Sequence, residues 1–426
     1  MTPKTGSGGL GMGDDPVGIS SPVRLVALVC AAQVLVQIGA FFWPALLPGM
    51  IGRWSLTNSE AGWITAIFYG AYILAVPILV TLTDRIDAKL VYLSGVATTV
   101  LGHMLFALAA DGFWTALVAR ALTGVGWAGT YMTGLKLLAD MVDARTMSRA
   151  AAGHAASIGI SGALSFACAD LIAGLAGWRV AFVAAGISAA LAWLLIALAV
   201  PARKRPAGPP PSKHALFDFR PVLRNRSAMA YAIAYCIHTL EMSALRGWGV
   251  AFLAFVAAAS ATDDALLSPT AVLTILGLTG TLASVLGNEA AIRLGRRRLI
   301  SLAMVGSAVC AVLLGIGGTQ SYVLAVVVML IYGPMVWLDS SSLTAGTAGT
   351  AEPARRGATL AVHSMLGYIG GFIGPLIVGW VLDLGGGMSA ATWAAAFALI
   401  AALMVAALTA FLRMRPRALA GDRGAD

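Results

Sequence analysis

The sequence predicts an all-α membrane protein with twelve transmembrane helices, built as two six-helix bundles related by a pseudo-twofold repeat. Of its 426 residues 59% are hydrophobic and 11% are charged, whereas water-soluble chains carry about 25% charged residues. A spanning helix needs about 20 mostly apolar residues, so the apolar content suffices for roughly twelve helices. Cations separate the apolar runs, and one polar stretch divides the chain into two similar halves.

The apolar runs define the helices in order. Six are expected in the first half, at 24–49, 59–83, 89–109, 112–138, 149–173 and 177–200. Six more are expected in the second half, at 228–257, 266–292, 297–317, 321–346, 357–384 and 388–412. A membrane β-barrel would need alternating segments of about ten residues, and no such segment is found in the sequence. Helices are then the remaining spanning structure.

The positions of Lys and Arg predict the orientation. Most of the 28 cations fall in alternate loops and at the chain ends if both termini are cytoplasmic, as the positive-inside rule requires. We therefore expect a multi-pass protein of the cell inner membrane with both termini in the cytoplasm. This distribution also accounts for the net charge of +9, so the charge does not indicate nucleic-acid binding.

The polar segments predict how the chain is divided. Residues 1–22 are predicted to form a disordered cytoplasmic tail. Residues 201–227, which are rich in proline and cations, are predicted to form a cytoplasmic linker. The N-terminal bundle is expected at 23–200, the C-terminal bundle at 228–412 and a second cytoplasmic tail at 413–426.

An internal repeat relates the two halves. Three features of the first half have counterparts in the second: Gly159 corresponds to Gly367, Gly162 to Gly370, and the segment 178–182 to the segment 393–397. Both segments begin with Trp and end with Phe. Two similar bundles predict a substrate cavity between them near the middle of the membrane.

Several motifs resemble those of the major facilitator superfamily, over about residues 24–412. Asp84 and Arg85 stand in a degenerate form of the family's loop motif after helix two, and Arg120, Gly124 and Gly126 match its helix-four pattern. The family antiporters' helix-five Gly-Pro pair is missing there; a Gly-Pro pair lies in helix eleven instead. The resemblance implies alternating access, with conformational roles for Asp84, Arg85, Gly124, Gly126, Gly370, Gly374 and Pro375.

Ionisable groups inside a membrane are costly and therefore indicate function. In helix seven, His238 and Glu241 lie about 60° apart and Trp248 within about 20° of Glu241, at 100° per residue, whereas Arg246 falls about 140° away. The functional interpretation puts His238 and Glu241 in the central cavity, with Glu241 accepting a proton. The alternative is a structural ion pair, for example between Glu241 and Arg120.

Other polar and aromatic side chains within the helices are further candidates for substrate binding or proton coupling. Helix ten combines Pro334, whose missing N–H leaves a backbone group free, with an acid, which suggests a cavity or gate. The candidates are Arg120, Gln33, Gln37, Tyr69, Tyr332, Trp337, Asp339, His363 and Tyr368, each with an alternative role in interhelical hydrogen bonding. Asp170 and Asp383 are expected near the outer surface, in solvent.

The sequence argues against an enzyme. It has no P-loop, and its four cysteines lie in apolar runs without metal-ligand spacing. We expect no cofactor, no metal and no catalytic residues, and transport energised by an ion gradient.

The function predicted is secondary active transport of a small solute by a monomer. The candidate site contains more basic side chains (Arg120, His238 and Arg246) than acidic ones (Glu241). A neutral to positive interior favours a small organic or inorganic anion as substrate, with protons or another ion as the coupling partner. Two alternatives remain. One is efflux of amphipathic toxic compounds through an apolar, aromatic binding site formed by Phe41, Phe42, Trp43, Trp248 and Trp337. The other is a transporter-like receptor that transports no solute.

Overall fold

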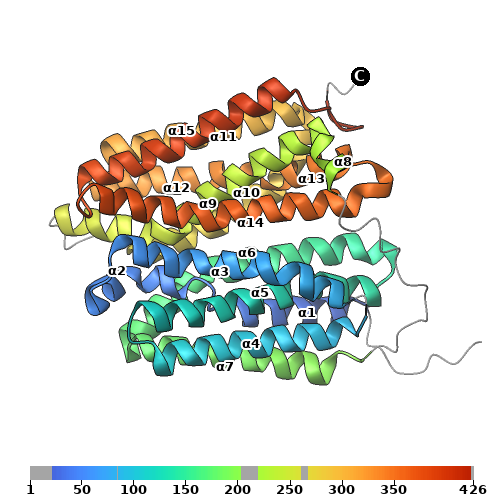
Figure 1. Cartoon of the computed structure of the whole chain (residues 1–426), viewed down its shortest axis with the longest axis horizontal. Helices are drawn as coiled ribbons and strands as arrows, with labels where there is room; N and C mark the ends of the chain where they lie inside the picture. Colours follow the sequence, from blue (N-terminus) through green and yellow to red (C-terminus); the bar gives the residue numbers. More distant parts are fainter. Residues whose placement is uncertain (1–21, 84, 203–218, 261–266, 424–426) are drawn as a thin grey trace, which may run out of the picture.

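The structure, a computed structural model, describes residues 22–83, 85–202, 219–260 and 267–423. Its helices form two layers, with the first half of the chain in one and the second half in the other (Figure 1). The helices of the first half are α1 (Pro22–Gln37), α2 (Phe42–Trp54), α3 (Asn58–Leu82), α4 (Ala88–Ala109), α5 (Phe113–Met141), α6 (Ala144–Ala176) and α7 (Trp178–Ala199).

The second half follows the short helix α8 (Arg220–Arg224). Its long helices are α9 (Arg226–Ser260), α10 (Pro269–Leu294), α11 (Arg296–Leu313) with the π-helical turn Leu314–Gly318, α12 (Tyr322–Leu338), α13 (Ser340–Thr350), α14 (Arg356–Leu384) and α15 (Ala390–Met414). A 3-10 turn, Pro353–Arg355, precedes α14.

The predicted fold of twelve spanning helices in two bundles is confirmed. Eleven helical segments of the described chain are long and apolar enough to cross a membrane, counting α1 with α2 and α12 with α13 as single spans. Helix α5 is the twelfth, and runs alongside the others in Figure 1. It carries Arg120, Lys136 and Asp140, which lower its apolar character.

The first span is broken between α1 and α2, and Pro44 explains why. Proline has no N–H to donate to the carbonyl four residues earlier and its ring pushes that carbonyl away, here the carbonyl of Ala40. The Arg120 side chain of α5 donates to this oxygen from Nη1 at 3.0 Å. The buried arginine therefore supplies the hydrogen-bond donor that Pro44 lacks, and the freed carbonyl supplies an acceptor for the buried guanidinium.

The most extensive contacts between the two halves are those of α3 with α14, α6 with α10, and α2 with α9. We call the end of the molecule where α1 begins and α15 ends the terminal face, and the opposite end the distal face. Near the distal face the halves approach closely, since a Cβ added to Gly62 of α3 would lie 2.8 Å from the Pro375 carbonyl oxygen of α14.

Two aspartates bridge the halves at the distal face. Asp383, at the end of α14, accepts hydrogen bonds from the backbone N–H groups of Asn58 (3.0 Å) and Ser59 (2.7 Å) and from the Asn58 side chain (2.8 Å). Its carboxylate thus caps the N-terminus of α3, where an anion is favoured. On the other side, Thr270 of α10 donates to Asp170 of α6 at 2.7 Å. The expectation that Asp383 is merely solvated is wrong.

Candidate functional site

The side chain of Arg246 crosses from α9 towards the first half. Its guanidinium carbon lies 4.9 Å from the ring centre of Phe41 and 4.7 Å from that of Trp337, and Gly162 of α6 lies near its Nη2. Stacking on aromatic rings stabilises a guanidinium. No carboxylate of the described chain pairs with it, so Arg246 is a cation at the interface between the halves with free hydrogen-bonding capacity.

Arg120 is a second cation near this interface. Its side chain is buried, stacks on Phe68 with its guanidinium carbon 4.8 Å from the ring centre, and uses Nη1 for the Ala40 carbonyl. Its Nε has no hydrogen-bond partner among the described residues. Tyr69 lies close enough to interact electrostatically with both Arg120 and Arg246.

Aromatic side chains join the halves beside these arginines. Tyr368 of α14 stacks on Tyr72 of α3, with ring centres 3.6 Å apart and planes inclined by 14°. Its hydroxyl also accepts a hydrogen bond of 3.1 Å from Trp127 of α5, and Tyr69 lies 6.3 Å away, centre to centre. Of these four residues, sequence reasoning identified Tyr69 and Tyr368 and missed Tyr72 and Trp127.

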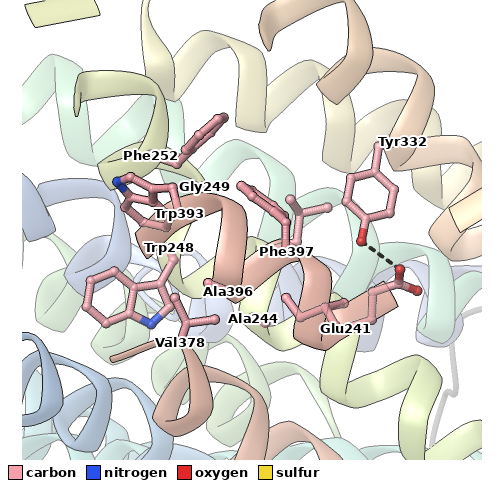
Figure 2. A pocket seen from close by; sticks show the side chains of 12 residues that line it. Glu241, Ala244, Trp248, Gly249, Phe252, Tyr332, Val378, Trp393, Ala396 and Phe397 are labelled. Atoms are coloured by element: carbon pink, nitrogen blue, oxygen red, sulfur yellow. Dashed lines mark hydrogen bonds between the residues drawn. The ribbon is translucent and has the colours of Figure 1, made fainter. Parts of the chain in front are cut away.

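Glu241 points elsewhere, into a small cavity inside the second half (Figure 2). It accepts a hydrogen bond of 2.6 Å from the Tyr332 hydroxyl of α12, and its Oε2 has no partner among the described residues. The prediction that Glu241 faces the cavity between the halves is wrong for this conformation, because this side of α9 packs on α12 and α15.

Trp248 also lines that cavity, with Phe252, Trp393 and Phe397 (Figure 2). Of the predicted stripe of His238, Glu241 and Trp248 on α9, the last two share this cavity among mostly apolar and aromatic neighbours, whereas His238 does not line it. Trp248 donates its indole N–H to the Pro375 carbonyl at 2.9 Å, which ties α9 to α14. The cavity volume is about 10 Å³, which is room for about one water molecule.

His238 and Asp339 form a buried pair between α9 and the junction of α12 with α13. His238 Nδ1 lies 3.0 Å from Asp339 Oδ1, but the contact lacks hydrogen-bond alignment, and His238 Nε2 has no partner among the described residues. The two groups are therefore close without being fully satisfied. Asp339 stands where the tenth span is interrupted, five residues after Pro334.

His363 is held by threonines. Its Nε2 lies 3.1 Å from Thr344 Oγ1 and its Nδ1 lies 3.0 Å from Thr347 Oγ1. Tyr235 stacks on the ring at 4.0 Å between centres, and also on His238 at 5.5 Å. With both nitrogens occupied, His363 forms the interhelical contacts that its structural interpretation predicts.

Two glutamines of α1 are buried in the first half. Gln33 accepts a hydrogen bond of 3.2 Å from Tyr92, whereas no described residue bonds to the amide of Gln37. Gln37 lines a small cavity with His103, Thr123 and Thr130. This cavity lies within the first half, and its lining also includes Phe68, which stacks on Arg120, and Trp127, which bonds to Tyr368.

The motif glycines pack helices within each half. An added Cβ would meet the Phe68 carbonyl oxygen at 2.2 Å from Gly124, the Cys236 carbonyl oxygen at 1.9 Å from Gly370, and the Leu240 carbonyl oxygen at 2.2 Å from Gly374. Gly126 similarly lies against Thr99 of α4. Only glycine allows these backbones to approach so closely, whatever part the glycines take in movement.

Of the two charged motif residues after α3, Asp84 lies outside the described residues and Arg85 is exposed. The corresponding turn after α10 lacks an acid of its own. Arg296 there donates from Nε and Nη2 to Asp422 near the end of the chain, both at 3.0 Å. Sequence reasoning did not pair them, because no local spacing connects residues 126 positions apart.

Comparison with known proteins identifies the family. The model of the Major Facilitator Superfamily matches residues 29–333. The chain belongs to the major facilitator superfamily. Its members are membrane transporters, which agrees with the expectation that the chain is not an enzyme.

Relatives within the superfamily include spinster proteins. The chain is 26% identical to human protein spinster homolog 1 over 242 residues, which are 54% of this chain and 45% of that protein, so the match spans less than half of the relative's length. It is 22% identical over 388 residues to the sphingosine-1-phosphate transporter SPNS2 of Xenopus tropicalis, covering 85% of this chain and 74% of that one.

Solved structures of the superfamily share the fold. A bacterial homologue of the human lysosomal transporter Spinster, in an inward-facing and occupied conformation, matches with a TM-score of 0.71 at 15% identity, covering 93% of this chain and 96% of that one. The nucleoside transporter NupG matches with a TM-score of 0.69 at 16% identity, covering 91% and 99%.

Proposed function

We propose that this protein is a secondary active transporter that carries an organic anion with an apolar portion between the two halves. The supporting observation is Arg246, a cation between two aromatic rings at the interface, with Tyr69 and Arg120 nearby and no described carboxylate paired with it. An anionic group of the substrate would bond to the guanidinium, and the apolar portion would lie against the rings.

A relative supports the same substrate class. The name of SPNS2 describes it as a sphingosine-1-phosphate transporter, and that substrate joins a phosphate to a long apolar chain. From this substrate we take only the chemical class, which is an anion with an apolar portion, and we assign no single compound to the protein. This class lies between the anion and the amphipathic compound that the sequence predicted as alternatives.

Thermal stabilisation of the purified protein tests the substrate class. A ligand that binds the folded state alone stabilises it by RT ln(1 + [L]/Kd), about 2.7 kcal/mol at 100 times Kd. Fatty acids, lysophosphatidic acids and sphingosine-1-phosphate form the panel, with the matching alcohols and amines as uncharged and cationic analogues. We expect stabilisation by the anions alone.

Two variants identify the group that binds the anion. Arg246→Gln should remove the stabilisation, whereas Arg179→Gln, at the exposed start of α7 where its guanidinium stacks on Trp178, should keep it. Equal stabilisation of Arg246→Gln and the wild type by the same anion would contradict the proposed site.

We further propose that transport is coupled to protons through Glu241. Its carboxyl group is buried, has Tyr332 as its hydrogen-bonding partner, and no described cation pairs with it. An acid without a fixed counter-ion can take up and release a proton without breaking an ion pair. It also lies on α9, the helix that carries Arg246, so substrate and proton sites would share one element.

Reconstituted vesicles separate coupling from binding. With an imposed proton gradient, wild-type protein should accumulate substrate and lose the accumulation with an uncoupler. Glu241→Gln should keep exchange of labelled for unlabelled substrate and lose accumulation, while Glu289→Gln, in the exposed pair with Arg293, should behave as wild type. Accumulation by Glu241→Gln at the wild-type level would refute the role of this carboxyl group.

The remaining expectations follow from this function and stay proposals. They are a place in the cell inner membrane, both termini in the cytoplasm, a monomer as the working unit, and a linker at 201–227. The terminal face would then be the cytoplasmic one, and the structure, with its distal face held together by Asp383, would be closed towards the outside.

A further inference from the structure

A second group of cations lies at the terminal face of the second half, far from Arg246. Arg226 begins α9, while Arg413 and Arg415 stand at the end of α15. Together with Thr409 and Leu412 they line a cavity of about 500 Å³. A neighbouring cavity of about 950 Å³ shares Arg226 and Arg415 and adds Arg224 and Arg417.

The charges in these cavities are unbalanced. The first cavity has no acidic residue in its lining. The second has Glu352, and this carboxylate lies 3.4 Å from Nε of Arg355. Arg226 donates to the Arg413 carbonyl at 2.6 Å, but the guanidinium groups of Arg413 and Arg415 have no partner in the described chain. Clustered arginines of this kind suit a phosphate, which accepts paired hydrogen bonds from guanidinium groups.

The backbone that carries these arginines is fixed. Arg415 adopts a left-handed conformation with φ 49° and ψ 61°, which is uncommon for a residue other than glycine. The turn is held on its far side, where Tyr231 donates to the Arg417 carbonyl at 3.0 Å and the Arg417 N–H donates to Ser227 at 3.1 Å. The cavity is therefore built into the fold.

One wall of the first cavity belongs to the lipid-facing surface. Thr409 and Leu412 are exposed on the outer side of α15, and Val405 continues this surface one to two turns further into the membrane. A ligand in the cavity would meet arginines at one end and lie along an exposed apolar helix face at the other. A free phosphate ion would use only the first of these features.

We propose that this cavity binds the headgroup of an anionic phospholipid, with its phosphate on Arg413 and Arg415 and its acyl chains along α15. Basic pockets at the ends of membrane helices bind acidic headgroups through the same chemistry. The site is separate from the transport site, and a substrate of any charge is compatible with it.

Thermal unfolding of the purified full-length protein in detergent micelles tests this. Adding phosphatidylglycerol should raise the unfolding temperature of the wild type, whereas phosphatidylcholine with the same chains should not. In Arg413→Gln/Arg415→Gln the rise should be lost. The matched control is Arg297→Gln/Arg298→Gln, which removes two exposed arginines from the same face outside the cavity and should keep the full rise.

The alternative outcomes are distinct. An equal rise in the cavity variant and the wild type would overturn the proposal, as would equal stabilisation by phosphatidylglycerol and phosphatidylcholine. Stabilisation by soluble glycerol phosphate as strong as that by the lipid would show a site for free phosphate instead. Because the cavity variant must be folded, its elution as a single species in size-exclusion chromatography is checked first. If it does not fold, the lipid retained by the wild type and by Arg413→Gln alone is counted by mass spectrometry, with less retention expected in the variant.

Discussion

Arg120 shows how one residue supports two interpretations that the sequence could not separate. Its side chain is buried and bonded to the carbonyl that Pro44 leaves free. This contact explains why an arginine is tolerated there, because a buried carbonyl without a donor is costly. Of the other two nitrogens of the guanidinium group, Nε has no described partner, so Arg120 keeps the capacity to bond to a second group.

A double-mutant cycle tests the structural part. Arg120→Gln should destabilise the protein by about 1.5–3 kcal/mol, the range for a hydrogen bond to a charged group. Pro44→Ala restores an N–H that can bond to the Ala40 carbonyl. Arg120→Gln should therefore lower the free energy of unfolding by less in the Pro44→Ala protein than in the wild type. Unfolding midpoints of the four proteins give the coupling. An equal loss in both backgrounds would show that Arg120 does not compensate for Pro44.

Among individual side chains, the sequence predicted types and helix faces better than partners. The spacing put Glu241 and Trp248 on one side of α9, and both line the same cavity. It could not indicate that Tyr332 or Asp339 stands opposite, because a partner depends on which helices are adjacent and on their relative rotation. For the same reason Asp383 was expected in solvent, while it caps a helix of the other half.

At the scale of helices, the distal contacts repeat with the symmetry of the fold. Asp383 ends a helix of the second half and bonds at the start of α3 in the first. Asp170 lies near the end of α6 in the first half and accepts from Thr270 at the start of α10 in the second. In each pair a carboxylate from the C-terminal part of one helix meets the N-terminus of another, where the helix dipole favours an anion.

Removing the Asp383 cap should open the distal face. A lost cap costs about 1 kcal/mol, so Asp383→Ala should shift the balance between closed and open forms about fivefold. Thr65 of α3 is buried where it faces Gly247 of α9, so Thr65→Cys reports this opening when the four native cysteines are replaced by serine. We expect labelling by a membrane-impermeant maleimide to be several times faster.

Asp111→Ala is the control for this measurement. Asp111 is exposed near the distal face but bonds to Thr115 of its own half, so its loss should leave the labelling rate unchanged. Identical rates for Asp383→Ala and the parent would exclude Asp383 from closure.

The spans themselves were predictable, because about 20 apolar residues between cations are a strong and local signal. All twelve expected spans correspond to helices. The interruptions were harder. Pro334 led us to expect a cavity or gate in the tenth span, but α12 continues through Pro334 and the helix breaks only at Asp339. The break before Phe42 was missed, because it depends on Arg120 being available to bond to the freed carbonyl.

At the scale of the whole molecule, the end of the described chain is part of the second bundle. Asp422 and Arg296 form a bidentate pair with both side chains nearly inaccessible, 2% and 3% exposed. Arg296 also donates to Asn288 at 2.9 Å and to the Ser342 carbonyl at 3.2 Å. One arginine thus joins α10, α11, α13 and the segment after α15. The predicted tail at 413–426 includes this segment.

Asp422→Asn should therefore be strongly destabilising. Removing one partner of a buried ion pair leaves the other charge uncompensated, at a cost of about 3–5 kcal/mol. The unfolding midpoint should fall clearly below that of Glu289→Gln, which breaks an exposed pair worth about 0–1 kcal/mol. Arg296→Met combined with Asp422→Leu should regain part of the loss, because neither charge is then buried alone. If Asp422→Asn unfolds at the wild-type temperature, the pair does not hold the bundle together, and the segment after α15 is bound by its backbone contacts to Tyr231 and Ser227.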